Sequence, residues 1–328
     1  MKDVVSQLIF DLIYSALSVD GRDELFGKRL DIDRELFANG FAGDEFPILW
    51  FELPLSGDPW YDLHVLTKKS ALSPDSKIPE GIFYPKLFEW FAKRDGVRQL
   101  AMSFDISKGD YYNPAAQLLV SGSDPSVGCD FLEEAGNIPA RNAYKAFADN
   151  LPDGWFACYL GTFPGRSDLN LRVECIPDQQ LQVAYSKDPA LLRRDLGQCG
   201  FAISDEMLEF VRTMSDQPVQ IEFQFNVGPD GMAEPTLGVS LRFVAPVGNH
   251  SHLAFLEENE NVVSLMGALE DAGLCDDRWR KLPGCAFIKR LSAGGVSVRF
   301  GGYTAFIKVR MTPDRLIDAK TYIYASML

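Results

Sequence analysis

Residues 218–227, PVQIEFQFNV, and residues 235–244, PTLGVSLRFV, are two stretches in which apolar and polar side chains alternate. Alternation with a period of two residues predicts a β-strand with one apolar and one polar face. The segment between them begins with GPDG (228–231), whose glycine, proline and aspartate residues favour a tight turn. The two stretches therefore predict an antiparallel hairpin that buries one face and keeps the other polar.

Four further pairs of strand-like stretches follow the same pattern at loosely regular intervals. They are 46–55 with 60–67, 97–106 with 115–121, 155–163 with 169–176, and 285–291 or 297–310 with 319–325. Stretches with helical periodicity separate the pairs. They lie at 83–95, 125–150, 188–199, 204–214 and 261–273. Hairpins separated by helices predict an α+β protein.

The long connections between hairpins decide how the sheet is arranged. A hairpin returns the chain to the end of the sheet where it began, so each connection must leave and return at that end. Closure of the sheet would protect its edges, and outer helices would cover its apolar face. We therefore predict a closed ten-stranded antiparallel β-barrel built from five ββ hairpins, with an outer ring of α-helices. In this prediction residues 1–328 form a single domain, and residues 1–45 are a helical segment packed on the barrel.

Charge and hydropathy exclude two classes of partner. The 328 residues contain 32 Lys and Arg against 46 Asp and Glu, which gives a net charge of −14. Such a chain repels phosphate backbones and anionic lipid surfaces, and no basic stretch compensates. No stretch approaches the roughly 18 to 20 apolar residues that cross a bilayer. We predict neither a nucleic-acid nor a membrane partner.

The cysteines and the first residues predict the compartment. Six cysteines occur without a CxxC pair or a regular framework, which favours reduced thiols over disulfides. Asp3 and Asp11 interrupt the apolar run at the start of the sequence, which argues against a signal peptide. These observations predict a cytoplasmic protein.

The polar faces of the predicted strands carry an unusual number of cations. If the apolar faces meet the helices, the polar faces line the interior of the barrel, where ten strands leave room for a ligand. The alternative is that the polar faces are solvated surfaces of an open sheet. Each cation could also form an ion pair with Glu174 or Glu222. The five cations are Arg172, Arg242, Lys308, Arg310 and Lys320.

Two short motifs on the last strands resemble a known family. They are Lys320-Thr-Tyr322, with Tyr324 one step further, and Lys308-Val-Arg310. Together with paired strands and outer helices from about residue 46 to 328, they resemble the ABBA-type aromatic and peptide prenyltransferases. That family has a ten-stranded barrel which holds an isoprenoid diphosphate and an acceptor in its centre. The resemblance implies a prenyltransferase that moves an isoprenoid to an aromatic small molecule or a peptide side chain.

The resemblance and the physical chemistry assign roles to the interior residues. A buried diphosphate needs several cations, which also stabilise the leaving group as the carbon–oxygen bond ionises. Aromatic faces stabilise a carbocation and exclude water. The predicted diphosphate site contains Arg172, Arg242, Lys308, Arg310, Lys320 and Tyr322. The predicted cation shield and acceptor pocket contains Trp50, Tyr159 and Tyr324.

Glu52 is the predicted catalytic base, and Glu222 is the second choice. Glu52 shares a strand face with Trp50, in the region where indole-modifying members of the resembling family carry a glutamate. A carboxylate in a desolvated interior is expected to have a raised affinity for protons and to accept one from an indole, phenol or guanidine. The alternative for Glu52 is a salt bridge at the rim.

Metal catalysis has little support in the sequence. His64 stands alone, and the pair His250-Ser-His252 lacks carboxylate or cysteine partners at ligand spacing. We predict no metal site and no required cofactor, although Mg²⁺ could accompany the diphosphate. Two alternatives remain open: a non-catalytic barrel that binds a peptide or other ligand, and a barrel that modifies amides or peptides without an isoprenoid.

Overall fold

A computed structural model describes most of the chain, and its strands form one sheet. The described residues are 19–27, 48–73, 83–106, 110–120, 124–163, 171–215, 220–242, 260–285, 287–293 and 296–327. Within them the antiparallel sheet has eleven strands. The strands are β1 Ile48–Pro54, β2 Asp62–Lys68, β3 Val97–Asp105, β4 Asp110–Val120, β5 Trp155–Thr162, β6 Leu171–Pro177, β7 Gln220–Val227, β8 Ala233–Arg242, β9 Phe287–Ala293, β10 Val296–Met311 and β11 Leu316–Met327.

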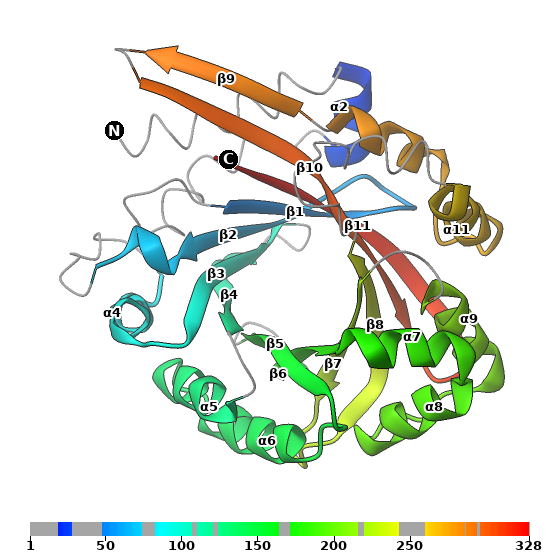
Figure 1. Cartoon of the computed structure of the whole chain (residues 1–328). Coiled ribbons are helices and arrows are strands. Elements are labelled where there is room, and N and C mark those ends of the chain that lie inside the picture. The colour runs from blue at the N-terminus through cyan, green and yellow to red at the C-terminus, as the bar shows by residue number, and fades with distance from the viewer. Residues whose placement is uncertain are drawn as a thin grey trace.

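Ten of these strands close into a barrel (Figure 1). The strand order runs from β1 through β8 to β10 and β11, and β11 pairs with β1 to complete the ring. The closing register places Leu49 opposite Ala325 and Pro54 opposite Lys320. The predicted ten-stranded antiparallel barrel is thereby confirmed.

The extra strand β9 resolves an alternative that the sequence leaves open. Residues 297–310 belong to the ring strand β10, whose second half pairs with β8. Strand β9 pairs only with the first half of β10, from Val296 opposite Ala293 to Gly302 opposite Phe287. This hairpin extends away from the ring along the upper edge of Figure 1. Of the predicted stretch 285–291, residues 287–291 therefore belong to an appended hairpin, and Cys285 ends the helix η3 (Asp277–Cys285).

The described helices lie outside the ring, as predicted (Figure 1). They are α2 Val19–Phe26, η1 Lys69–Ala71, α4 Pro85–Lys93, α5 Pro125–Glu134, α6 Ile138–Asp149, α7 Gln179–Lys187, α8 Pro189–Gln198, α9 Asp205–Ser215, α11 Glu260–Asp271 and η3 Asp277–Cys285. The predicted stretch 125–150 is two helices, because Gly136 has a φ of +76° and Asn137 caps α6 by accepting from the amide of Ala140. None of the helices in the described ranges is long and apolar enough to cross a membrane.

The hydrophobic core lies between the outer face of the barrel and the helices. On β1, Leu49, Phe51 and Leu53 are fully buried on this face. Helix α7, which has no clear apolar stripe in the sequence, is attached through a buried polar chain. The indole Nε1 of Trp155 donates to the hydroxyl of Tyr185 at 2.6 Å, and that hydroxyl lies 2.7 Å from Asp195 Oδ2. The core therefore holds the strands in place from outside the barrel, and the side chains of the inner face are available to form a site.

Helix α2 is the described part of the predicted N-terminal segment. Phe26 is buried against Phe51 and Tyr61, with ring centroids 5.5 and 5.8 Å apart. Glu24 forms an ion pair with Lys281 of η3. Residues 19–27 thus pack on the outside of the barrel near β1. The rest of 1–45 lies outside the described residues, and the assignment of 1–328 to one domain stays a prediction.

Candidate functional site

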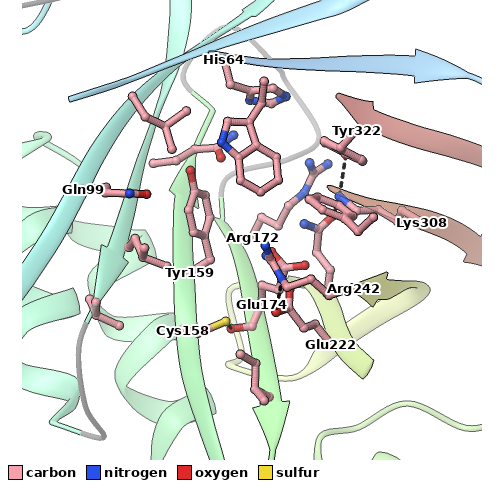
Figure 2. A pocket seen from close by; sticks show the side chains of 18 of the residues that line it. His64, Gln99, Cys158, Tyr159, Arg172, Glu174, Glu222, Arg242, Lys308 and Tyr322 are labelled. Carbon is pink, nitrogen blue, oxygen red and sulfur yellow. Dashed lines mark hydrogen bonds and ion pairs between the residues drawn. The ribbon is translucent and has the colours of Figure 1, made fainter. Parts of the chain in front are cut away.

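The inner face of the barrel encloses a cavity of about 550 Å³. Strand alternation directs the polar faces into it, as Figure 2 shows. Among the polar residues singled out in the sequence, those that line the cavity are Glu52, Arg172, Glu174, Glu222, Arg242, Lys308 and Tyr322. Trp50 and Tyr159 line it as well. Residues from both halves of the chain therefore meet in one enclosed space.

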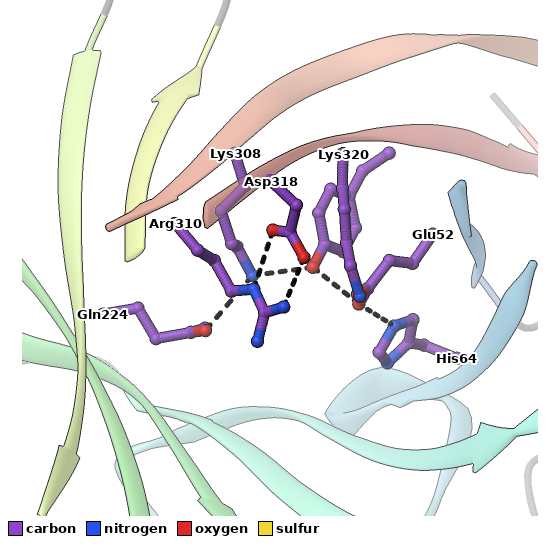
Figure 3. A network of polar contacts seen from close by, with 8 residues as sticks. Glu52, His64, Gln224, Lys308, Arg310, Asp318 and Lys320 are labelled. Carbon is purple, nitrogen blue, oxygen red and sulfur yellow. Dashed lines mark hydrogen bonds and ion pairs between the residues drawn. The ribbon is translucent and has the colours of Figure 1, made fainter. Parts of the chain in front are cut away.

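Glu52 is the centre of a hydrogen-bonded network on one wall (Figure 3). Its Oε1 accepts from Lys320 Nζ at 2.5 Å, and its Oε2 accepts from the hydroxyl of Tyr322 at 2.6 Å. His64 Nε2 lies 3.3 Å from the same Oε2, while His64 Nδ1 lies 2.6 Å from Ser103 Oγ. Glu52 as a whole residue is 8% exposed, so each of these contacts forms with little competing water.

The charge state of Glu52 differs from the sequence-based expectation. Burial alone raises the pKa of this carboxyl group. The positive charge of Lys320 and the hydrogen bond to His64, with a smaller effect of Lys308, outweigh burial and hold the pKa of Glu52 well below its ordinary value. The expectation of a raised proton affinity at Glu52 is therefore wrong, because the sequence did not reveal that Lys320 is its partner.

Lys308 connects this network to the next strands. Its Nζ donates to the hydroxyl of Tyr322 at 2.7 Å and to Gln224 Oε1 at 3.3 Å. Burial lowers the pKa of Lys308 to about 8, against the attraction of Glu174 and Glu52. This amine therefore gains and loses a proton close to neutral pH.

Arg242 on β8 and Glu222 on β7 form a two-pronged ion pair beside the strand that carries Lys308 (Figure 2). Arg242 Nε lies 2.6 Å from Glu222 Oε1, and Nη2 lies 2.9 Å from Oε2. Glu174 lies beside this pair and accepts from Ser240 Oγ at 3.0 Å. Burial, and then the nearby charge of Glu174, raise the pKa of Glu222 to about 7 despite Arg242. Glu222 is thus the carboxyl group in the cavity that titrates near neutrality.

Aromatic side chains line the cavity between the hydrogen-bonded network of Glu52 and the Arg242–Glu222 ion pair. Phe306 and Tyr322 are stacked, with centroids 4.0 Å apart and ring planes at 16°. The ring of Trp50 packs against Phe306, with ring centroids 5.1 Å apart. The guanidinium of Arg242 lies 4.9 Å from the Phe306 centroid and 5.5 Å from that of Trp50. A continuous aromatic surface therefore adjoins the cations.

Two β-bulges change which side chains reach the inner face. A register shift between Thr304 and Phe306 places Tyr303 beside Tyr324, with ring centroids 4.9 Å apart. Strict alternation from the buried Ile307 and Val309 would place Tyr303 on the outer face, but the bulge adds one residue and brings it to the inner face. A second shift between Ala157 and Tyr159 brings both Cys158 and Tyr159 to the cavity. Burial raises the pKa of Tyr159.

Three of the predicted site residues do not line the cavity. Lys320 is held by Glu52 and also lies 4.9 Å from the ring centroid of Trp60. Arg310 forms an ion pair with Asp318, with Nε 2.8 Å from Oδ1. Tyr324 packs against Trp50 at 5.8 Å, and its hydroxyl lies 2.6 Å from Ser326 Oγ. These three residues lie around the site, and their predicted roles in binding stay proposals.

Several residues of the site were not assigned a role from the sequence. His64 alternates with the buried Leu63 and Val65, so the same parity rule would have placed it inside. Phe306 lies on the same strand face as Lys308 and Arg310, but it was not predicted as a site residue because it has no polar group. Arg98 lines the cavity from β3. His250 and His252 lie outside the described residues.

No metal-binding constellation is found in the described part of the chain. Groups of three or more His, Cys, Asp or Glu side chains with suitable geometry are absent there. All six cysteines are free thiols. The predicted cytoplasmic location rests on the sequence alone.

Comparison with known proteins places the fold. A scan of family models and a search of curated protein sequences each found no match. Among solved structures, the apo form of the prenyltransferase PriB matches with a TM-score of 0.51 and 14% identity, over 99% of this chain and 95% of that one. A 6-dimethylallyl tryptophan synthase matches with a TM-score of 0.50 and 10% identity, over 93% of each chain. The resemblance to the ABBA-type prenyltransferases is therefore confirmed for the fold.

Proposed function

We propose that this protein transfers an isoprenoid group from an allylic diphosphate to an aromatic acceptor bound inside the barrel. The observation that carries the proposal is that cations and stacked aromatic rings lie next to each other in one cavity. Lys308 Nζ lies 4.5 Å from the ring centroid of Tyr322, which in turn stacks on Phe306. The names of the two fold neighbours, a prenyltransferase and a dimethylallyl tryptophan synthase, support the same chemistry.

The diphosphate of the donor would bind to Lys308, Arg172 and Arg242. These cations line the cavity from three strands, β10, β6 and β8. Cations in a partly desolvated space bind phosphate oxygens strongly and stabilise the negative charge that develops on the leaving group. Lys320 and Arg310 would add positive charge from behind Glu52 and Asp318. In this proposal the cations neutralise the diphosphate without a required metal ion.

The isoprenoid chain would lie on the surface formed by Trp50, Phe306 and Tyr322. When the carbon–oxygen bond ionises, the electron pair leaves with the diphosphate and an allylic cation remains. The faces of aromatic rings attract such a cation, and their apolar surface keeps out the water that would capture it. Tyr159, on the opposite side of the cavity, would close the acceptor pocket.

Glu52 would receive the proton that the acceptor loses. The addition of an allylic cation to an aromatic ring gives a positively charged product that is a strong acid. A carboxylate with a lowered pKa is always ionised at neutral pH, and a weak base suffices for this proton. Glu222 remains the second choice as base, because its pKa of about 7 suits proton acceptance but its carboxylate is held by Arg242.

Product mass after incubation tests the proposal directly. The protein is incubated with dimethylallyl or geranyl diphosphate and with panels of indoles, phenols and short peptides, with and without a metal chelator. A mass gain of one isoprenoid unit on an indole or phenol supports the proposal, and a gain on a peptide shifts the acceptor class. If no acceptor gains mass, a binding barrel becomes the better reading. Lys308→Met is the control, because it removes a donor-site cation from within the barrel.

A further inference from the structure

The guanidinium of Arg242 is already occupied by a carboxylate from inside the protein. Its two nitrogens contact both oxygens of Glu222, at 2.6 and 2.9 Å, and the Glu222 residue is 1% exposed. Both residues line the cavity. The proposed donor site therefore contains an anion before any substrate enters.

A carboxylate and a phosphate present the same feature to a guanidinium. Each offers two oxygens that accept parallel N–H bonds from the planar fork. Glu222 and a diphosphate would thus compete for the same donors of Arg242. A diphosphate bound next to Glu222 without exchange would also place like charges together in a desolvated space, which is unfavourable.

We infer that Glu222 is the resident counter-ion of the donor site, which a diphosphate replaces on Arg242 while Glu222 takes up one proton from solvent. This inference rests on the proposed donor site. It makes Glu222 a residue that sets donor affinity before the chemical step. It also makes the strength of donor binding dependent on pH.

The neighbours of Glu222 explain why the displaced carboxylate would take up a proton. Once Arg242 turns to the diphosphate, Glu222 would be a buried charge beside a second carboxylate, Glu174. Two adjacent carboxyl groups share one proton more readily than they carry two charges. The pKa of Glu222 is already raised to about 7 with Arg242 in contact, so the loss of this partner raises it further. No new base or acid is needed, because water supplies the proton.

The experiment must separate the pH dependence caused by Glu222 from that caused by other charged or titratable groups nearby. Lys308 has a pKa lowered to about 8, so it also gains a proton as the pH falls. Pyrophosphate itself binds protons in this range. Wild type and Glu222→Gln share the same pyrophosphate and the same Lys308, whose pKa is raised by Glu174 and Glu52, so the difference between them reports Glu222. The groups around Glu222 are Glu174 and Arg172 on β6, Arg242 on β8, Cys158 and Tyr159 on β5, and Lys308 on β10.

Glu174→Gln is the matched control for Glu222→Gln. Both substitutions remove one negative charge from the same cavity and keep the shape of the side chain. Glu174 accepts from Ser240, whereas Glu222 holds Arg242, so only Glu222→Gln frees the guanidinium. Loss of negative charge alone would strengthen pyrophosphate binding in both variants, although Glu174→Gln also removes an attraction that raises the pKa of Lys308, so the two are compared at pH values below about 8, where Lys308 is protonated in the wild type.

The test measures the affinity of the whole chain for inorganic pyrophosphate between about pH 6 and about pH 8.5, where a group with a pKa near 7 titrates. We expect wild-type affinity to fall as the pH rises. At a pH just below about 8 we expect Glu222→Gln to bind about tenfold more tightly than wild type, by more than Glu174→Gln, and with a smaller pH dependence. Equal or weaker binding by Glu222→Gln would overturn the inference, because Glu222 would then only position Arg242.

A second measurement on the wild type does not depend on any variant folding. Calorimetric titration with pyrophosphate in two buffers of different ionisation enthalpy gives the number of protons taken up on binding. Proton uptake beyond that of pyrophosphate itself supports the exchange, and its absence near neutral pH contradicts it. If folded wild type and both variants fail to bind pyrophosphate, the proposed function fails. If wild type binds without a Glu222-dependent difference, only this inference fails.

Discussion

The amine of Lys320 lies 2.5 Å from Oε1 of Glu52, although the two residues are 268 positions apart in the sequence. Glu52 lies on β1 and Lys320 on β11, the two strands whose pairing closes the barrel. The ion pair therefore joins the closure of the fold to the charge of the site. Its side chains are 14% and 11% exposed, so solvent screens it weakly.

Removal of Lys320 is expected to destabilise the protein. Lys320→Met leaves Glu52 as a buried charge that keeps its hydrogen bonds to His64 and Tyr322 and the weaker attraction of Lys308 but loses its ion-pair partner, which costs about 3 kcal/mol. Arg310→Met is the comparison, because the side chains of the Arg310–Asp318 pair are 37% and 31% exposed and its loss should cost about 1 kcal/mol or less. Urea unfolding of both variants measures the difference. Equal losses would show that the Lys320 pair contributes no more than a surface pair.

Replacement of Glu52 by Gln is expected to slow prenyl transfer about 100-fold through loss of the proton acceptor. The amide keeps an oxygen for Lys320 and a similar volume, so the fold should persist. Steady-state rates with the best acceptor from the mass screen test this expectation, with the melting temperature as the control for folding. A variant that works at the wild-type rate would remove Glu52 from the mechanism.

The stability of the protein is expected to fall as the pH rises from about 4.5 to about 7 through the titration of Glu222. In this window the folded protein keeps a proton that the unfolded chain has released, because the pKa of Glu222 is raised from 4.5 to about 7. The folded state then binds more protons, so a rise in pH favours unfolding. The lowered pKa of Glu52 acts below this window, since its stabilisation is complete above the unfolded value.

Denaturation of Glu222→Gln over the same pH range isolates this contribution. The variant should show a flatter dependence of unfolding free energy on pH than the wild type between about pH 4.5 and about pH 7. An identical pH profile would mean that Glu222 titrates at its ordinary value in the folded protein.

Loss of the aromatic surface is expected to divert the allylic cation to water. Phe306→Leu removes the ring that stacks on Tyr322 at 4.0 Å and keeps an apolar side chain. The ratio of prenyl alcohol to transferred product should rise about tenfold, because the leucine gives no cation–π stabilisation and admits water. Tyr324→Phe is the control, since it changes a hydroxyl that bonds to Ser326 at 2.6 Å, apart from the cavity lining. A similar ratio in both variants would contradict the role of Phe306.

The fold could be predicted because its two main signals are local. Alternation in stretches such as 218–227 gives each strand and its faces, and the long connections require closure with helices outside. Helix α7 escaped prediction because residues 179–187, QQLQVAYSK, have no clear apolar stripe, and its burial depends on Tyr185 contacting Trp155. The structure of this helix is decided by tertiary contacts.

From the sequence, the site could be predicted only to the extent that each strand residue could be assigned to the inner or the outer face of the barrel. Alternation tells which side a residue faces, but the depth of a side chain along the barrel depends on the stagger between strands. Lys308 and Lys320 share an inner face and are cross-strand partners, yet Lys308 lines the cavity and Lys320 is held by Glu52. Alternation alone would place Tyr303 on the wrong face, because the bulge between Thr304 and Phe306 is not visible in the sequence pattern. Strand alternation, which placed Arg172 on the inner face, would also have placed His64 there, because His64 alternates with the buried Leu63 and Val65.

The pairing of the first and last ring strands has a consequence for biosynthesis. During translation β1 is made long before β11, so Glu52 remains without Lys320 and Tyr322 until residue 322 has been synthesised. Contacts with such a large sequence separation form late, because many residues must be ordered before they are possible. Nascent chains that stall before residue 316 lack β11, and they have two unpaired strand edges that can associate with other chains. Aggregation of such truncated chains, and its absence for chains that extend through β11, would mark the pairing of β11 with β1 as the step that protects the strand edges and completes the site.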